Sequence, residues 1–258
     1  MIKKSLILEL KNVKKYFPKF KLGPVNLKIY SGERIALVGE NGSGKTVLCN
    51  IISGLIKINE GQIELPNTLL PKTKNIFTSE RFVDFHQEIK RRKLISISTK
   101  EEEWPRLLKV KEIIELFKIL FFQEIEPDSF NKLEKTLLKN FNLDEYIYRT
   151  SFGQKQRLNL FLGLVPTRKI FIGDEITTGM DIKSEIDTLL FLENKLKNNP
   201  DNVLILSSHN WEEIKKLCQR IIILKNGQVK INLTLKKFIT KFKNLQNYFK
   251  NKKENEDY

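Results

Sequence analysis

The spacing of apolar residues changes several times along the chain, and each change predicts a different element. Residues 6–13 and 23–33 alternate apolar with polar side chains, as half-exposed antiparallel strands do. Short continuous apolar runs, which are typical of strands covered on both faces, occupy 34–39, 169–175 and 203–209. Apolar residues at helical spacing predict helices at 46–56, within 110–149, and at 154–165, 182–196 and 211–218. Buried strands that alternate with helices indicate an α/β fold with a mainly parallel sheet.

Shorter elements complete this pattern. Strands are predicted at 61–65 and 94–98, and a strand pair over 220–231 turns at Asn226 and Gly227. Within 66–93 we expect a loop and then a short basic helix capped by Ser79. After residue 232 apolar residues recur at near-helical intervals, but the final run "KNKKENEDY" is too polar to bury, so we expect it to be disordered.

Composition and charge narrow the class of protein. The chain has 258 residues and a net charge of +15, yet only nine of its 46 basic residues are arginine. Sequence-specific readers of nucleic acid rely on arginine forks, so we expect no specific nucleic-acid partner. The lysines favour solubility and attraction to acidic surfaces, anionic lipid headgroups included.

The cysteine pattern and the lack of a long apolar run each predict something about the setting of the protein. Cys49 and Cys218 lie in apolar patterns, which argues against disulfides and zinc sites and favours a reducing cytosolic compartment. No apolar run is long enough for a membrane span, and the first segment predicts a strand rather than a signal peptide.

The segment "GENGSGKT" matches the G-x-x-x-x-G-K-[ST] pattern of a phosphate-binding loop and lies between a buried strand and a helix. In such a loop, backbone N–H groups and the positive end of the helix converge on the β- and γ-phosphates. Glycines allow the close approach, Lys45 supplies a point charge, and the Thr46 hydroxyl binds Mg²⁺. The predicted nucleotide-binding residues are Gly39, Glu40, Asn41, Gly42, Ser43, Gly44, Lys45, Thr46 and Val47. The sequence thus predicts a nucleoside triphosphate site.

Two carboxylates stand at the end of the buried strand 169–175. We predict that Asp174 binds Mg²⁺ through water and that Glu175 polarises the attacking water, because adjacent strand residues point opposite ways and need not share a role. An acidic loop start is the ordinary alternative, which the upstream phosphate loop disfavours. Asp181 follows on the turn before the next helix, where a site role and a helix N-cap are both open.

His209 ends the buried run 203–209, at the carboxyl edge of the sheet where α/β folds bind ligands. We predict that its side chain reaches the γ-phosphate, although a histidine satisfied within its own loop is the ordinary interpretation of an isolated residue. His86 has no such setting, and we expect it at the surface or in packing.

Taken in order, "GENGSGKT", "SFGQ", "IFIGDE", "TTGMD" and "SSHN" resemble the nucleotide-binding subunit of ATP-binding-cassette (ABC) transporters, over about residues 5–230. The resemblance implies a RecA-like P-loop NTPase core, an N-terminal antiparallel β-subdomain and an inserted α-helical subdomain. The expected boundaries are 1–94 and 159–231 for the ATPase core, 95–158 for the helical subdomain with its signature motif, and 232–258 for a basic helical or disordered tail.

The stretch "TSFGQKQR" is similar to the family's signature, usually Leu-Ser-Gly-Gly-Gln. In the family two cassettes pack head to tail, and the signature of one closes over the ATP held by the other. The resemblance implies that Ser151 and the N–H of Gly153 hydrogen-bond the γ-phosphate on a partner chain, with Gln154 in the same set. The start of the following helix adds its dipole.

Further roles follow from the same resemblance. Tyr16 matches the aromatic residue that stacks on adenine, with Phe17 as the neighbouring candidate and a core tyrosine at a strand end as the ordinary alternative. Asp181 matches the aspartate of the loop that links the two sites across the dimer. Glu175 matches the catalytic glutamate and His209 the switch histidine; with Lys45 they form the expected catalytic set.

The chain departs from the family at the glutamine that senses γ-phosphate and Mg²⁺. Alignment places Lys100 there, and lysine cannot offer a carbonyl to Mg²⁺. Either Lys100 gives its charge to phosphate, or Glu101 substitutes, or the step is slowed; Gln87 is the alternative position. The other departures, none of which removes a charged catalytic group, are Thr150, Phe152 and Ile176.

The resemblance therefore implies an ATP- and Mg²⁺-dependent ATPase subunit of an ABC transporter. Its expected partners are transmembrane permease subunits and a second cassette, in a homodimer or heterodimer, at the cytoplasmic face of the cell membrane. The wording "DEITTGMD" resembles bacterial export-type cassettes, which favours export. Two alternatives stay open: a soluble cassette protein acting on nucleic acid, ribosomes or iron–sulfur assembly, and a regulatory cassette that binds ATP without turnover.

Overall fold

The structure is a computed structural model that describes residues 5–66, 91–99 and 104–256. The chain divides into two compact units, of which the first joins Met1–Phe77 to Val203–Tyr258 and the second is Thr78–Asn202. The expected helix that Ser79 would cap lies outside the described residues, as do His86, Gln87, Lys100 and Glu101.

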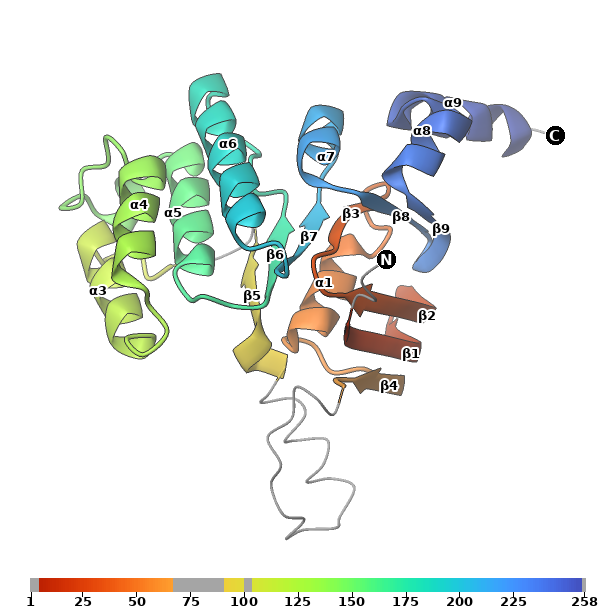
Figure 1. The fold of residues 1–258 in the computed structure, drawn as a ribbon, viewed down its shortest axis with the longest axis horizontal. Coiled ribbons are helices and arrows are strands. Elements are labelled where there is room, and N and C mark those ends of the chain that lie inside the picture. The colour runs from red at the N-terminus through yellow and green to blue at the C-terminus, as the bar shows by residue number, and fades with distance from the viewer. Residues whose placement is uncertain (1–4, 67–90, 100–103, 257–258) are drawn as a thin grey trace, which may run out of the picture. The chain divides into compact units, whose positions relative to one another are not determined.

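The first unit contains a three-stranded antiparallel sheet in the order β2-β1-β4 (Figure 1). Strand β1 (Leu6–Phe17) pairs with β2 (Phe20–Tyr30) on one side and with β4 (Glu60–Glu64) on the other. The buried positions of β1 change phase between Leu10 and Val13, where a register shift accompanies a positive φ of 49° at Asn12. This bulge keeps apolar side chains on the core face as far as Val13. The predicted antiparallel subdomain is confirmed.

A second sheet of the first unit is parallel apart from one strand. Strand β3 (Arg34–Val38) lies between β7 (Val203–Ser207) and β8 (Arg220–Lys225), parallel to both. Strand β9 (Gln228–Thr234) returns antiparallel to β8 through Asn226 and Gly227, whose φ angles are 48° and 73°. Two positive φ angles are what the predicted Asn-Gly hairpin turn requires.

Four helices lie in the described residues of the first unit: α1 (Lys45–Ser53), α7 (Trp211–Leu217), α8 (Leu235–Phe242) and α9 (Leu245–Glu256). The ring of Phe238 is fully buried and contacts the rings of Trp211, Phe242 and Tyr248. This aromatic cluster anchors the C-terminal helices to the unit.

The expected disorder of "KNKKENEDY" is corrected as far as Glu256, because α9 continues to that residue. Leu245 and Tyr248 are buried in its first turns, so nucleation is supplied by packing. Adding further lysine and glutamate residues to an existing helix then requires little free energy.

The second unit pairs a partly buried strand with a fully buried one, in parallel, and carries the helical block. Strand β5 (Ile95–Ser98) lies parallel to β6 (Ile170–Asp174). The helices are α3 (Val110–Leu120), α4 (Pro127–Leu137), α5 (Phe152–Leu164) and α6 (Ile182–Asn198). Phe130 of α4 packs edge-on against Phe161 of α5, with ring centroids 5.3 Å apart. The α/β class and the helices predicted within 110–149 are confirmed. None of the helices in the described ranges combines the length and apolar character needed to cross a bilayer.

One arginine ties the two sheets of the first unit together. The Arg220 guanidinium donates to both carboxylate oxygens of Glu33, at 2.9 and 3.1 Å, and to the carbonyl of Lys28 at 2.9 Å. Its Nε donates to Asn232 at 2.8 Å, and the side chains of the ion pair are only 17% and 18% exposed. The three bonds to Glu33 and Lys28 share one terminal nitrogen, Nη1, so Nη1 and Nε together fix the guanidinium in a poorly hydrated place.

We expect Arg220→Ala to lower the free energy of unfolding by about 2–3 kcal/mol, because the half-buried Glu33 carboxylate loses its cationic partner and keeps only the N–H of Tyr30. Arg220→Lys should recover only part of the loss, since a single ammonium nitrogen cannot replace both Nη1 and Nε. Urea unfolding measures both. The control is Lys215→Ala, which breaks an exposed pair with Glu212 and should cost less than about 1 kcal/mol. If Arg220→Ala and Lys215→Ala lost equal free energy of unfolding, the stabilising role of the Arg220 contacts would be contradicted.

Candidate functional site

The phosphate-loop segment joins the buried strand β3 to helix α1, as the sequence predicted. Gly42 and Gly44 adopt positive φ angles of 77° and 101°. A Cβ at Gly44 would lie 2.7 Å from the Phe20 ring, whereas a Cβ at Gly42 would meet nothing within 4 Å. The backbone at Gly42 is therefore open to close approach by a ligand, while Gly44 is required by packing.

The Lys45 side chain lies against its own loop. Its Nζ donates to the carbonyl of Gly39 at 2.7 Å and to that of Glu40 at 3.2 Å, and the residue is only 7% exposed. Glu40 and Asn41 are exposed at the loop tip, whereas Thr46 and Val47 are half-buried in the first turn of α1. The ammonium is thus held where its carbonyl partners can be exchanged for phosphate oxygens.

A second loop of the first unit leaves the same edge of the sheet. In the parallel ladder Leu37 pairs with Ser207, and Gly39 and His209 each follow two residues later. The Ser208 hydroxyl donates to the buried Glu213 carboxylate and accepts from the N–H of Asn210 at 3.0 Å. These bonds fix the loop, and the His209 side chain is exposed on it. Strand register therefore places His209 at the sheet edge that carries the phosphate loop.

The aromatic residues at the end of β1 are half exposed, Tyr16 at 39% and Phe17 at 38%, so neither is a core residue. The ring centroids of Phe17 and Phe20 lie 6.3 Å apart, and the Phe20 ring fills the space beside Gly44. The end of the β1–β2 hairpin therefore contacts the phosphate loop. Phe20 was not among the predicted site residues; the signal for it in the sequence is the aromatic pair of "FPKF" at a hairpin turn.

In the second unit, the two predicted carboxylates lie where β6 ends. Asp174 is 4% exposed, and Glu175 has a left-handed φ of 51°, which is uncommon for a residue other than glycine. The Glu175 carbonyl accepts from Gln156 Nε2 at 3.1 Å and from the N–H of Thr178 at 3.2 Å. The turn that follows β6 is thus fixed, and it gives Glu175 a direction that strand alternation alone would not give.

The signature segment forms the N-terminus of α5. Ser151 Oγ accepts from the N–H of Gln154 at 3.2 Å, while Gln154 Oε1 accepts from the N–H of Ser151 at 2.9 Å. This is a capping box, and it leaves the Ser151 hydroxyl proton available as a donor. A Cβ at Gly153 would lie 2.5 Å from the carbonyl of Gly179, so the signature packs closely on the loop before α6.

Asp181 is the N-cap of α6. Its carboxylate accepts from the Ser184 hydroxyl at 2.6 Å and from the Ser184 N–H at 2.9 Å. The hydroxyl bond first, then the backbone bond, and last the charge of Arg157 lower the pKa of Asp181, so the carboxylate is ionised near neutral pH. The N-cap alternative accounts for its contacts within the chain; its role across a dimer stays a prediction.

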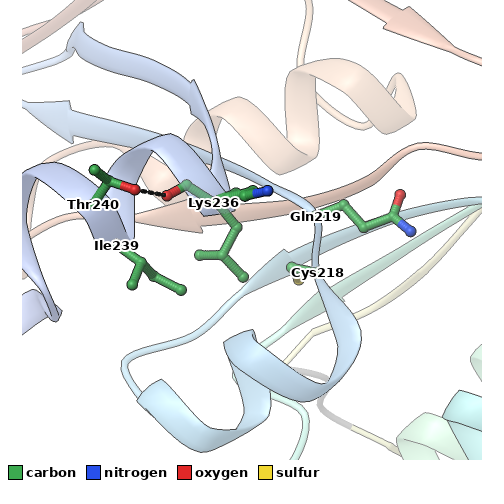
Figure 2. Close-up of a pocket in the computed structure, with 6 residues that line it drawn as sticks. Cys218, Gln219, Lys236, Ile239 and Thr240 are labelled. Carbon is green, nitrogen blue, oxygen red and sulfur yellow. Dashed lines mark hydrogen bonds between the residues drawn. The ribbon is translucent and has the colours of Figure 1, made fainter.

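A pocket of about 400 Å³ lies elsewhere in the first unit, beside α8 (Figure 2). Figure 2 shows Lys236, Ile239 and Thr240 on one wall and Cys218 and Gln219 on the other. Burial first, and then the charge of Glu213, raises the pKa of the Cys218 thiol, so this thiol stays protonated. None of the predicted nucleotide-binding residues lines the pocket. Among the described residues no cluster of three or more histidine, cysteine or acidic side chains is arranged to hold a metal ion.

Comparison with known proteins bears on the family of the chain. The family model for the ABC transporter matches residues 22–178, which include the phosphate loop, the signature segment and both strand-end carboxylates. The chain is 29% identical over 231 residues to the ribose import ATP-binding protein RbsA of Bacillus subtilis strain 168, covering 86% of this chain and 43% of that protein. It is 28% identical over 256 residues to a tyrosine transport ATP-binding protein of Clostridioides difficile strain R20291, covering 92% and 98%. The chain thus spans less than half the length of several relatives that it matches.

Solved structures agree on the fold. The ATP-binding subunit of an ABC transporter matches with a TM-score of 0.71 at 21% identity, covering 92% of this chain and 93% of that chain. A dimeric ATP-binding cassette in a post-hydrolysis state, bound to ADP and Pi, matches with a TM-score of 0.70 at 24% identity, covering 89% and 99%. These matches show the expected core with its β-subdomain and helical subdomain. Because the family model spans more than half of its residues, the chain belongs to the ABC transporter family.

Proposed function

We propose that the chain is the ATP-binding and ATP-hydrolysing subunit of an ABC transporter. The observation that carries the proposal is the phosphate loop: an open backbone at Gly42 and a buried ammonium at Lys45, at the N-terminus of α1. Such a loop suits a polyanion, because N–H groups, helix dipole and ammonium act on the same side. A relative named for tyrosine transport, which matches over nearly its whole length, supports the proposal.

In this proposal a few residues bind the phosphates, bind Mg²⁺ and activate the attacking water. Lys45 and the backbone N–H groups of the loop bind the β- and γ-phosphates, and His209 contacts the γ-phosphate. Thr46 and the buried Asp174 supply oxygen donors of the kind that Mg²⁺ prefers, Asp174 through water. The bound ion would neutralise charge that develops on the phosphates. Glu175 polarises the attacking water, and its strained backbone is typical of a functional position.

A second cassette completes the proposed site. Ser151, Gly153 and Gln154 contact the γ-phosphate of ATP held by the partner chain, and Asp181 links the two sites. The free hydroxyl proton of Ser151, at the N-terminus of a 13-residue helix, supports this role. ATP then closes the dimer and hydrolysis releases it, which is how the subunit would drive its partners.

Permease subunits in the membrane are the proposed partners, and the chain would work at the cytoplasmic face. Relatives named for ribose import and tyrosine transport support a transport role. The expectation of export rests on the segment "DEITTGMD" alone. The relatives named for ribose are importers and do not support it. Export stays a prediction, which substrate uptake and efflux by vesicles containing the assembled complex would test.

We expect Lys45→Ala to weaken ATP binding at least about tenfold and to abolish turnover, because charge-assisted bonds to phosphate are lost. Calorimetry and phosphate release measure the two effects. Lys57→Ala, which removes an exposed lysine after α1, is the control and should behave as the unmodified chain does. Undiminished ATPase activity in Lys45→Ala would remove the assignment of the phosphate loop.

The variant Glu175→Gln keeps the shape of the side chain but removes its negative charge. In the assembled complex we expect phosphate release to fall about 10²- to 10³-fold while ATP affinity changes less than about twofold. Glu115→Gln, on the exposed side of α3, serves as the control. If the unmodified complex and the variant both release phosphate at the same near-zero rate, the chain is a regulatory cassette and the proposed hydrolysis is wrong.

A large cation at Ser151 tests the contact across the dimer. Ser151→Arg should bind ATP as a single chain with unchanged affinity and yet form no dimer with ATP, because the side chain would fill the partner's phosphate position. Light scattering in the Glu175→Gln background detects the dimer. Asn131→Arg adds the same side chain at an exposed position of α4 and should dimerise normally. Normal dimerisation of Ser151→Arg would overturn the role of the signature.

A further inference from the structure

Strand β4 and the residue before it hold Tyr16 through two separate bonds. Asn59 Oδ1 accepts from the N–H of Tyr16 at 2.9 Å, and the Glu60 carboxylate accepts from the Tyr16 hydroxyl. Lys14, two residues earlier on the same face of β1, donates to the other oxygen of Glu60 at 2.7 Å. The carboxylate thus binds Lys14 and Tyr16 together across the β1–β4 pair.

The backbone sets the position of Glu60. Lys14 is the register partner of Glu60, just beyond the bulge of β1. Gly61 has a φ of 91°, and a Cβ there would lie 2.4 Å from the carbonyl oxygen of Asn12 and 2.5 Å from that of Lys11. Only glycine allows β4 to approach β1 this closely, so the carboxylate is held at one register.

The Tyr16 ring is presented rather than buried. The residue Tyr16 is 39% exposed, although its hydroxyl and its backbone N–H both donate hydrogen bonds. The Lys21 ammonium lies 5.0 Å from the ring centroid and attracts the π face. The Lys15 ammonium likewise lies 5.5 Å from the Phe17 ring centroid, but that ring packs with Phe20 and has no hydroxyl through which a polar group could hold it.

We propose that Glu60 is a positioning residue for the nucleotide base: it fixes the Tyr16 phenol so that the ring is already placed to stack on the purine of ATP. The proposal rests on the proposed function, and it assigns the base contact to Tyr16 rather than to Phe17. A side chain that is immobile before binding loses little rotamer freedom when the base stacks on it, so the free energy of binding improves.

The protonation states that the bond needs are the ones the surroundings favour. Bonds from Lys14, and next from Tyr16, lower the pKa of Glu60. The same carboxylate raises the pKa of Tyr16, mainly through the hydrogen bond. Near neutral pH the carboxylate is therefore ionised and the phenol protonated, as a donor and acceptor pair requires.

The test compares two carboxylates of the same strand. Glu60→Ala should weaken ATP binding, measured by calorimetry with Mg²⁺, by about three- to tenfold. Glu64→Ala removes a similar exposed pair, with Lys11 at 2.6 Å, but touches no aromatic ring, and its affinity should stay within about twofold. Inorganic tripolyphosphate has no base, so it should bind all these variants equally.

Three further variants separate positioning from general structure. Tyr16→Phe keeps the ring but loses the bond, so it should match Glu60→Ala, and the double variant should be no weaker than either. Glu60→Gln retains a carbonyl acceptor and should restore most of the affinity. These results would assign the effect to the bond between Glu60 and Tyr16.

Two results would overturn the positioning role: ATP affinity of Glu60→Ala equal to that of Glu64→Ala, or an equal loss of ATP and tripolyphosphate binding. Neither would touch the proposed function as long as Lys45→Ala still loses ATP. An unmodified chain that fails to bind ATP, or whose binding is insensitive to Lys45→Ala, would instead remove the proposed function itself, and the base contact with it.

Discussion

The parallel pairing of β3 with β7 and β8 is the constraint on which the first unit depends. Four of the five residues of β3 are buried, and ladders occupy both of its edges. Since every backbone group of a buried strand needs a partner, β3 cannot shift without losing two sets of bonds. Its end therefore fixes the start of α1, and the register with β7 fixes His209 at the same edge. The turn after β8 adds a bond from Gly227 to the carbonyl of Ser43 at 3.0 Å.

Glycine contacts play a similar part in both units. Gly44 accommodates the Phe20 ring, and Gly153 accommodates the carbonyl of Gly179. In each case a segment proposed to bind phosphate rests directly on a neighbouring segment, with no room for a side chain between them. Such close contacts fix the position of a loop although they bury little surface area. The binding segments are therefore organised before a ligand arrives.

Local patterns predicted the buried strands, the phosphate loop and most helices, because each of these depends on spacing within about 20 residues. The contacts of Tyr16 with Glu60, and of Gly44 with Phe20, join residues more than 20 apart and leave no periodic trace. The sequence therefore suggested an aromatic partner for the base but gave no hint of what holds it. The end of α9 was missed for a related reason: composition indicated a polar tail, whereas packing earlier in the helix decided its state.

The left-handed backbone at Glu175 has a thermodynamic consequence. A residue with a Cβ in this conformation stores about 1 kcal/mol or more of unfavourable energy, which glycine would release. The chain therefore gives up some folding free energy to keep a carboxylate at the tip of β6. Selection for thermal resistance alone would favour glycine there, whereas the catalytic role proposed for Glu175 would oppose that replacement.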